Sequence, residues 1–330
     1  MLSLLAYIYG KVADLRNHLY DRGVFESRHL GARTISIGNI TTGGTGKTPL
    51  VAYVAYILAA RDEKICILTR GYGRANPKQR VLVSDGENIL ANVSEAGDEP
   101  FELAQKLIGK AIVIADADRV AAAEWAKRKF GVTAFVLDDG FQHRKANRDL
   151  DIVCIDAGAP FGGGKMLPAG RLREPVENLK RADVVIITRA HLSDEINNLK
   201  FEISNLAPNK PIFEAENRIS KITELLGDGE FNKKTLIFAF CGIGNPENFF
   251  ELLRQENLNN AGRRSFADHH FYTQIDIAAI EREAAEAGAE VLLTTAKDAV
   301  KLSNLKFEMP IYVVEIAMII DDADAFAAMF

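Results

Sequence analysis

The sequence has few cysteines, and none are paired at a metal-binding or redox spacing. Cys66, Cys154 and Cys241 are the three cysteines among 330 residues, and each lies in or beside a short apolar run, with no C-x-x-C pattern. This placement is typical of reduced thiols in a protein core. The sequence therefore predicts a reducing compartment, the cytoplasm, and argues against a disulfide-stabilised secreted scaffold.

The chain also lacks a basic charge excess and a strongly apolar composition. Its formal net charge is −5, which gives no global electrostatic signal for a nucleic-acid partner, and we expect none. Apolar residues make up 48% and charged residues 26%, ordinary globular values that exclude a disordered or low-complexity chain. A mean hydropathy of −0.03 excludes a polytopic membrane protein. The length suffices for about two domains at roughly 150 residues each.

No apolar run at the amino terminus is long enough to span a bilayer, which takes about 20 residues. The uncharged stretch ends at Gly10, has no preceding Lys or Arg and is followed by no small-x-small cleavage site, so it is not a typical signal peptide. Apolar residues at helical spacing mark one face: Leu5, Ile8, Val12, Leu15 and Leu19. Two interpretations stay open: a helix docked on its own domain, or an interfacial helix whose Lys11, Arg16 and Arg22 meet lipid headgroups.

From residue 33 onward, short apolar strands alternate with helices. Strands are predicted over 34–39, 64–70, 81–88, 111–116, 132–139, 151–156 and 182–189. This alternation predicts an α/β fold with a mostly parallel sheet and helices on both faces. The pattern degrades around 207–235, which suggests an inter-domain connection, and a second, smaller α/β cycle follows. We expect three parts: an amphipathic helix in 1–30, a large domain over 31–215 and a smaller domain over 216–330.

A phosphate-binding loop is the strongest local motif. SIGNITTGGTGKTPL at 36–50 follows a predicted strand and opens a predicted helix, the context that a P-loop requires. Gly46, Lys47 and Thr48 match the consensus, whereas Thr41 replaces its first glycine. Such a loop turns backbone N–H groups toward phosphate oxygens. The expected nucleotide-binding residues are Thr41, Thr42, Gly43, Gly44, Thr45, Gly46, Lys47 and Thr48.

A pair of carboxylates ends a later apolar strand. VTAFVLDDG places Asp138 and Asp139 where parallel strands present ligand-binding groups, beside the P-loop. We expect Thr48, Asp138 and Asp139 to hold Mg²⁺, which favours oxygen ligands. The alternative is a solvated turn, because D-D-G is also good turn chemistry. A guanine-reading N/T-K-x-D is not matched by TAKD at 295–298, which favours ATP over GTP.

Further polar clusters follow along the chain: RGYGR (70–74), GDEP (97–100), FQHR (141–144), LPAGRLREP (167–175) and ADHHF (267–271). Each has a structural alternative. GDEP is a good helix start in its own right, and the His pair of ADHHF fits an exposed polar loop. The arginines of these clusters fit a solvated surface equally well.

Taken together and in this order, these motifs resemble the tetraacyldisaccharide 4′-kinase family of lipid A biosynthesis. The resemblance runs from about Gly38 to Lys301 and includes CGIGNP and TAKDAVKL. LDDGFQHR and LPAGxLREP are far more specific than the P-loop, which many unrelated proteins share. Thr41 resembles this family's own variant of the loop.

The resemblance implies a P-loop NTPase-like kinase. It would transfer the γ-phosphate of ATP to the 4′-hydroxyl of a tetraacylated glucosamine disaccharide 1-phosphate, giving a lipid IVA-type product. It implies a peripheral, monomeric enzyme on the cytoplasmic face of the bacterial inner membrane, reached by the amino-terminal helix. The smaller domain would close over a nucleotide held by the larger one.

The resemblance also implies roles for individual residues. Asp98 is the expected base, helped by His269, which we choose over His270 because it follows the aspartate of the D-H pair. Further candidates for phosphate, Mg²⁺ or substrate contacts are Arg70, Arg74, Glu99, Arg119, Gln142, His143, Arg173 and Glu174. The alternatives are a P-loop ATPase that serves as a switch or assembly factor without a lipid acceptor, and a soluble kinase with a polar acceptor.

Overall fold

The computed structural model describes residues 2–190, 195–268, 270–302 and 304–330. The strands are β1 (Arg33–Asn39), β2 (Ile65–Thr69), β3 (Val81–Ser84), β4 (Ala111–Ala115), β5 (Ala134–Asp138), β6 (Leu150–Asp156), β7 (Val184–Thr188), β8 (Ile212–Glu224), β9 (Ile237–Cys241), β10 (Asn260–Ser265), β11 (Val291–Thr295) and β12 (Ile311–Ile320). The helices are α1 (Leu2–Asp21), α2 (Lys47–Ala59), α3 (Val93–Ala96), α4 (Asp98–Lys106), α5 (Arg119–Phe130), α6 (Ile196–Leu206), α7 (Pro246–Gln255), α8 (Gln274–Glu286), α9 (Ala296–Ala299) and α10 (Ala323–Ala327), with a 3₁₀ turn η1 at Val176–Arg181.

The described strands form one twelve-stranded sheet in the order β10-β9-β11-β12-β8-β7-β6-β1-β5-β2-β4-β3. Most neighbouring strands are parallel, whereas β3 and β4, and likewise β8 and β12, are antiparallel. The strands β1, β2 and β4 to β7 are buried almost throughout, as expected for a sheet covered on both faces. The predicted strands and the mostly parallel arrangement are therefore present.

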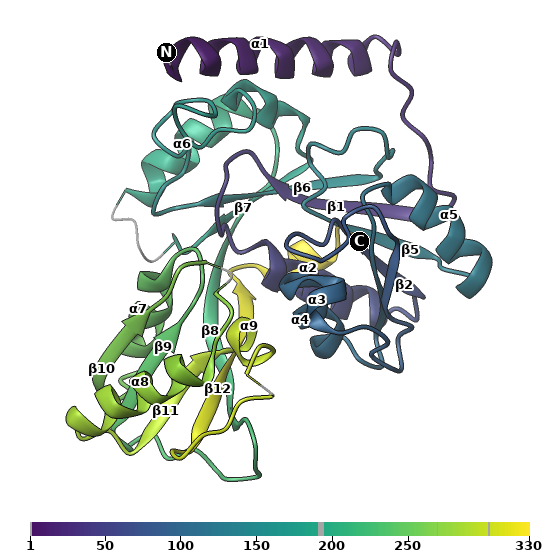
Figure 1. The fold of residues 1–330 in the computed structure, drawn as a ribbon. Coiled ribbons are helices and arrows are strands. Elements are labelled where there is room, and N and C mark those ends of the chain that lie inside the picture. Colours follow the sequence, from purple (N-terminus) through teal and green to yellow (C-terminus); the bar gives the residue numbers. More distant parts are fainter. Residues whose placement is uncertain (1, 191–194, 269, 303) are drawn as a thin grey trace.

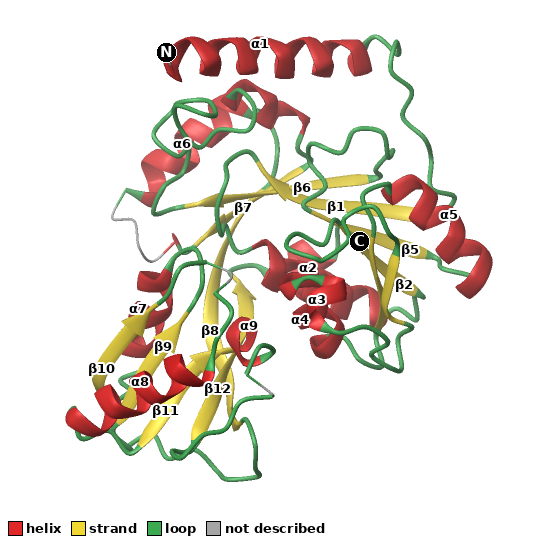
Figure 2. Cartoon of the chain, viewed as in Figure 1, coloured by secondary structure: helices red, strands yellow, loops and turns green. Residues whose placement is uncertain are grey.

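Helices cover both faces of the larger part of the sheet, which runs from β7 to β3 (Figure 2). Leu50 and Leu58 of α2 and Leu103 of α4 belong to the buried cluster on one face. Val120 and Ala123 of α5 belong to a cluster on the other face. Helices α2 and α5 connect parallel strands, whereas α4 lies between the antiparallel strands β3 and β4. The apolar sides of these helices cover the sheet and leave the strand ends open for a site.

The region where the sequence pattern degrades folds into β8, a single strand of 13 residues. Its first residues, 212–215, pair in parallel with β7, and residues 215–224 pair in antiparallel with β12. One strand thus joins the two parts of the sheet, and a domain boundary at residue 215 remains a prediction, placed where β8 changes partner.

The smaller part of the sheet, β9 to β12, has α7 on one face and α8 on the other. Phe250 and Leu253 of α7 pack in one cluster, and Ile277 and Ile280 of α8 in another. The chain then returns to the larger part, because Phe326 of α10 packs in the core with α2. The carboxyl terminus therefore supports the helix that follows the P-loop.

Helix α1 runs along one side of the molecule, away from the smaller part of the sheet (Figure 1). Ile8, Val12 and Leu15 are 50%, 59% and 58% exposed, so this part of the predicted apolar face is not covered by the described residues. Arg16 Nη2 donates to the Gln142 carbonyl at 2.9 Å, so part of this guanidinium is used within the chain. Its contact with lipid headgroups stays a prediction. Within the described residues, no helix is both long and apolar enough to cross a membrane.

Candidate active site

The P-loop joins the carboxyl end of β1 to the first turn of α2. Gly46 has a φ of 77°, and a side chain there would place its Cβ 3.1 Å from Thr188 Cγ2, so the position favours glycine. Asn39 Nδ2 donates to Thr45 Oγ1 at 2.8 Å, and Thr188 Oγ1 donates to the Thr45 carbonyl at 3.1 Å. The loop is therefore held in place, with the helix N-terminus available to an anion.

Two arginines that sequence reasoning did not assign also hold this loop. Arg171 Nη2 donates to the Thr42 carbonyl at 2.8 Å, and Arg189 Nη2 donates to the Gly44 carbonyl at 3.2 Å. Arg189 also donates through Nε to Asp156 at 2.8 Å, and its own φ is 58°. Arg171 lies inside LPAGRLREP and was within reach of motif analysis, whereas no motif signals Arg189.

The carboxylates at the end of β5 lie beside the P-loop, because β5 is the parallel neighbour of β1. Asp139 Oδ1 is 3.4 Å from Lys47 Nζ, and both carboxylate oxygens of Asp139 accept from Arg173 Nη1 at 2.7 and 2.8 Å. Burial favours a higher pKa for Asp139, but Lys47 and Arg173 lower it below its ordinary value. Asp139 is thus ionised and orients Lys47.

The pKa of Asp138 is shifted in the opposite direction to that of Asp139. Burial, followed by the charges of Glu99 and Asp139, raises its pKa to about 7. Thr69 Oγ1 donates to Asp138 Oδ2 at 3.0 Å. This surplus of negative charge fits a divalent cation. The described residues contain no group of three or more His, Cys, Asp or Glu placed as metal ligands. Mg²⁺ needs only one or two carboxylates when phosphates and waters complete its shell.

Asp98 begins α4 and is buried at the junction with the smaller part of the sheet. Its Oδ2 is 2.8 Å from Nζ of Lys301, whose side chain is only 2% exposed and lies 4.0 Å from Asp298 Oδ1. Side chains from both parts therefore meet at the predicted base. Lys301 was not assigned from sequence, although it lies within TAKDAVKL. His269, the predicted helper, lies outside the described residues.

Several further predicted residues gather at the same sheet edge. Arg119 is buried and donates to the Asp138 carbonyl at 3.3 Å, and Arg173 holds Asp139. Glu99 is half-buried and close enough to raise the pKa of Asp138. Arg70 is exposed, with its guanidinium 5.4 Å from the Tyr72 ring centroid, and remains available to a ligand.

Two predicted contacts are corrected by the structure. Arg74 is buried and donates to the Ala115 and Pro77 carbonyls at 2.6 Å, so it supports the backbone instead of meeting a phosphate. Glu174 is 2% exposed and accepts hydrogen bonds from inside the protein, which leaves it no access to substrate. The predicted contact of His143 stays a prediction; burial, with the charges of Arg119 and Arg148, lowers its pKa to about 4, which favours a neutral ring near pH 7.

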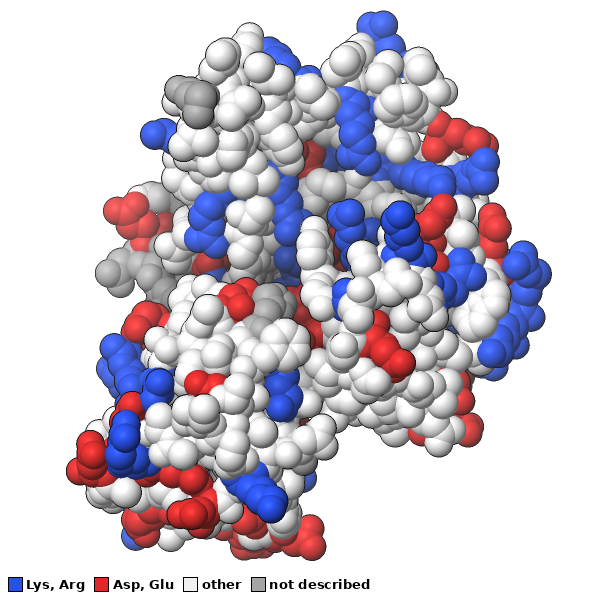
Figure 3. Space-filling model, viewed as in Figure 1, with Lys and Arg blue, Asp and Glu red and all other residues white. Residues whose placement is uncertain are grey.

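The face shown in Figure 3 has an uneven distribution of charge. Lys and Arg side chains gather across the middle of this face, and Asp and Glu gather at its lower end, over the smaller part of the sheet. A cationic surface raises the local concentration of a polyanionic ligand. The arrangement fits a substrate that carries several phosphates.

The chain is similar to known proteins over its whole length. Residues 1–330 match the family described as tetraacyldisaccharide-1-P 4′-kinase. Relatives named tetraacyldisaccharide 4′-kinase from Geobacter metallireducens and Geobacter sulfurreducens are each 40% identical, over 92% and 96% of this chain and 88% of each relative. LpxK from Aquifex aeolicus, solved in complex with ATP, superposes with a TM-score of 0.80 at 30% identity, covering 98% of this chain and 96% of that one.

These similarities confirm the resemblance and the P-loop α/β fold predicted from the motifs. The matches extend over nearly the full length of each relative, so the amino-terminal helix and the smaller part of the sheet are included. The chain belongs to the tetraacyldisaccharide-1-P 4′-kinase family.

Proposed function

We propose that this chain transfers the γ-phosphate of ATP to the 4′-hydroxyl of a tetraacyldisaccharide 1-phosphate, in lipid A biosynthesis. The observation that carries the proposal is the P-loop lysine, Lys47, 3.4 Å from Asp139 at the end of β5. The buried Asp98 begins α4 beside Glu99, whose charge acts on Asp138. The sequence relatives bear the name of this activity.

Phosphoryl transfer needs positioning and charge neutralisation more than covalent chemistry. The backbone of residues 41–48 would hold the phosphates of ATP, and Lys47, oriented by Asp139, would contact the β- and γ-phosphates. Arg173 keeps Asp139 in place for that task. Arg70, Arg119 and Glu99 are proposed to contribute charge close to the transferred group.

We propose Thr48 and Asp138 as the protein ligands of Mg²⁺. When bound, Mg²⁺ would neutralise charge on the β- and γ-phosphates. Asp139 is already paired with Lys47 and Arg173, so we assign it to orienting Lys47 and not to a direct metal bond. Ionisation of Asp138 is favoured by a cation nearby, which would offset the negative charge of Glu99.

Asp98 is proposed as the general base. It would accept the proton of the 4′-hydroxyl as that oxygen forms its bond to phosphorus and the bond between phosphorus and the ADP oxygen breaks. Lys301 would position the Asp98 carboxylate from the smaller part of the sheet. His269 stays a proposed helper. A cavity of about 940 Å³ lies between α4 and β12 and is lined by residues of both parts. We propose that the two parts close over the reactants when these bind.

The exposed apolar face of α1 supports a location at a membrane surface, where the lipid acceptor resides. We propose a peripheral, monomeric enzyme on the cytoplasmic face of the inner membrane, with no nucleic-acid partner. Helix α1 would lie in the interface plane, because its apolar side chains are exposed along several turns.

The test is an assay with γ-labelled ATP and a tetraacyldisaccharide 1-phosphate in detergent micelles. The proposal expects label in the lipid fraction, and a variant with Lys47→Ala should lose that label. Label released only as inorganic phosphate would support an ATPase instead and contradict the proposal. A polar sugar acceptor offered in parallel should remain unlabelled, and its labelling in preference to the lipid would support the soluble-kinase alternative.

A further inference from the structure

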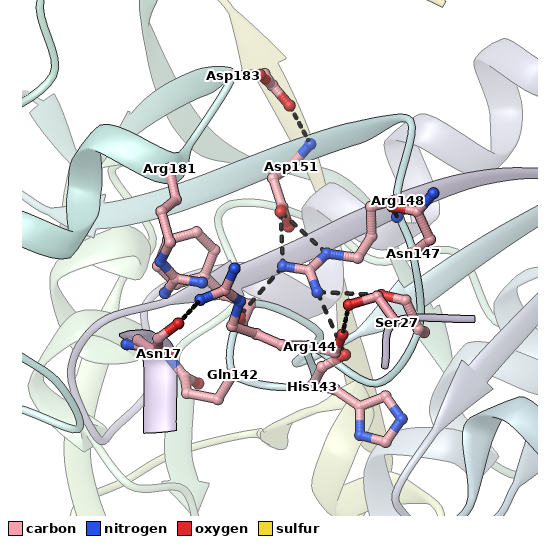
Figure 4. A network of polar contacts seen from close by, with 12 residues as sticks. Asn17, Ser27, Gln142, His143, Arg144, Asn147, Arg148, Asp151, Arg181 and Asp183 are labelled. Carbon is pink, nitrogen blue, oxygen red and sulfur yellow. Dashed lines mark hydrogen bonds and ion pairs between the residues drawn. The ribbon is translucent and has the colours of Figure 1, made fainter. Parts of the chain in front are cut away.

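Asn17 is a buried polar residue on a helix whose other side faces outward. It is 6% exposed, whereas Val12 and Leu15 of the same helix are more than half exposed. Arg144, from LDDGFQHR, donates to the Asn17 carbonyl at 2.8 Å. Figure 4 shows Asn17 directed at the Arg144 guanidinium, with Gln142 beside it. An amide is costly to bury unless it is hydrogen-bonded, so this placement needs a partner for the side chain.

The partner is Glu174. Asn17 Nδ2 donates to Glu174 Oε2 at 3.1 Å, and Gln142 Nε2 donates to Glu174 Oε1 at 2.6 Å. Arg181 pairs with the same carboxylate and lies over the Phe141 ring, 4.1 Å from its centroid. Glu174 is therefore a buried anion whose position depends on donors from three segments, one of which is α1. A buried network of this kind is fixed only when its members are satisfied together.

Gln142 extends this network to the P-loop. Its Nε2 also donates to the Asn39 carbonyl at 2.8 Å, and the Asn39 side chain holds Thr45 of the loop. A shift of Glu174 would therefore move Gln142 and disturb a contact with the residue that orients the nucleotide-binding loop.

Gln142 also reaches the carboxylate site. Arg173 Nη1 donates to Gln142 Oε1 at 3.4 Å and to both oxygens of Asp139, which lies 3.4 Å from Lys47 Nζ. Polar contacts thus run from Asn17 to the lysine of the P-loop without a break. Rotation of Gln142 would remove one hydrogen-bond acceptor from Arg173. A shift of Arg173 would then move Asp139, which accepts from the same nitrogen.

We propose that Asn17 is a positioning residue for phosphoryl transfer, acting through Glu174 and Gln142 on the P-loop and on Asp139. Helix α1 would then serve two purposes with two faces. Its exposed apolar face meets the lipid surface, and its Asn17 face holds the phosphate site in its productive arrangement. The proposal rests on the proposed function, and it predicts that α1 affects turnover as well as lipid binding.

The first test measures kcat and KM of Asn17→Ala with lipid acceptor in detergent micelles, where no bilayer is present. Asp14→Ala is the matched control, because Asp14 is an exposed polar residue of the same helix. We expect kcat of Asn17→Ala to fall at least tenfold below that of the control, more than KM rises. A kcat within threefold of the control, with or without a higher KM, would overturn the proposal.

Wild-type protein in the same assay separates the two claims. Failure of the wild-type chain to label the lipid counts against the proposed function. Wild-type labelling together with an unaffected Asn17→Ala variant counts against the positioning role alone. Asn17→Ser, which keeps a short hydrogen-bonding group, is measured in parallel and should recover part of the lost kcat; equal losses in both variants would contradict the hydrogen-bond explanation.

A double-mutant cycle tests the route. If Asn17 acts through Glu174, removing either one already breaks the network, so the two effects should not multiply. The variant with both Asn17→Ala and Glu174→Gln should be no more than threefold slower than the slower single variant. A larger reduction would show independent effects and contradict the route. General loss of folding is checked by the thermal midpoint of each variant with and without ATP.

Discussion

At the scale of single residues, the site depends on how differently its carboxylates are partnered. Asp139 lies between Lys47 and Arg173, Asp138 is buried with the charge of Glu99 nearby, and Asp98 contacts Lys301. We propose three different tasks for these carboxylates: Asp139 orients the lysine, Asp138 holds a cation and Asp98 accepts a proton. Environment assigns these tasks, because the side chains are chemically the same.

Asp98→Asn tests the base assignment. The amide keeps the shape of the side chain but cannot accept the hydroxyl proton, so kcat should fall by about 10²–10⁴. Binding of ATP should change little, because Asp98 is not part of the P-loop. The measurement is steady-state lipid phosphorylation alongside a nucleotide titration. Asp228→Asn, at an exposed position, is the control, and near wild-type turnover of Asp98→Asn would rule out the base role.

His143 gives the fold a pH dependence. Because burial lowers its pKa to about 4, the unfolded chain binds a proton between pH 6.5 and 4 that the folded chain does not. Stability should therefore decline as pH falls through this window. In His143→Asn, the unfolding free energy should fall by about 1–2 kcal/mol less than in the wild type over this pH window. This value is lower than the full pKa shift implies, because solvent screens the charge at a half-buried ring.

The measurement is urea denaturation of wild-type and His143→Asn proteins at pH 7 and pH 5. Relative to the wild type, the variant should have a higher unfolding free energy at pH 5 than at pH 7. His18→Asn, at an exposed histidine of α1, should show no comparable shift. The same gap at both pH values would mean that His143 is not kept neutral by the fold.

Motifs made much of the site predictable at this scale. Residue type and spacing in the P-loop and in the D-D-G motif predict phosphate and cation binding. Arg189 could not be predicted, because its contact with the Gly44 carbonyl depends on where β7 ends in space. Arg74 was misassigned for a related reason: sequence shows a charged residue among glycines but not that backbone carbonyls surround it.

At the scale of elements, α1 carries an apolar face whose side chains Ile8, Val12 and Leu15 are at least half exposed. Replacing Ile8 and Val12 together with Gln should weaken binding to anionic lipid vesicles by tenfold or more, because each side chain would lose apolar area buried in the interface. Vesicle co-sedimentation measures the effect. Ile275→Gln is the matched control, since Ile275 is 82% exposed on the smaller part of the sheet.

Equal vesicle binding by the Ile8 and Val12 variant and by the control would show that α1 is not the membrane contact.

Periodicity predicted the helix and its apolar face but left the docking of that face open. Docking depends on tertiary packing, which local spacing does not encode. The strand β8 shows the same limit, because its change of partner from β7 to β12 has no signature in the residues themselves.

At the scale of the whole molecule, the carboxyl terminus supports the nucleotide-binding helix. Phe326 is fully buried, with ring centroids of Tyr53 and Phe213 at 6.1 and 5.4 Å. Phe326→Ala should cost about 3–5 kcal/mol of unfolding free energy, because it leaves a cavity under α2. Urea denaturation measures this loss. Phe201→Ala, at a residue 71% exposed, should change stability by about 0.5 kcal/mol or less.

A small effect of Phe326→Ala would show that the last residues are not integrated in the larger core.

The chain order alone suggests that the carboxyl terminus belongs with the smaller part of the sheet. The sequence therefore did not predict that residues 318–330 pack in the core cluster that contains α2. Closure of the two parts over bound reactants stays a proposal, with the Asp98–Lys301 ion pair at their junction.

The central claim is that a phosphate is placed on the 4′-oxygen of a lipid disaccharide. Its most direct test is a phosphorus–proton correlation NMR experiment on the lipid product formed by the wild-type protein with ATP and Mg²⁺. The account predicts a new phosphate monoester that correlates with the proton on carbon 4′. A new ester at any other hydroxyl, or phosphate released only into water, would contradict it.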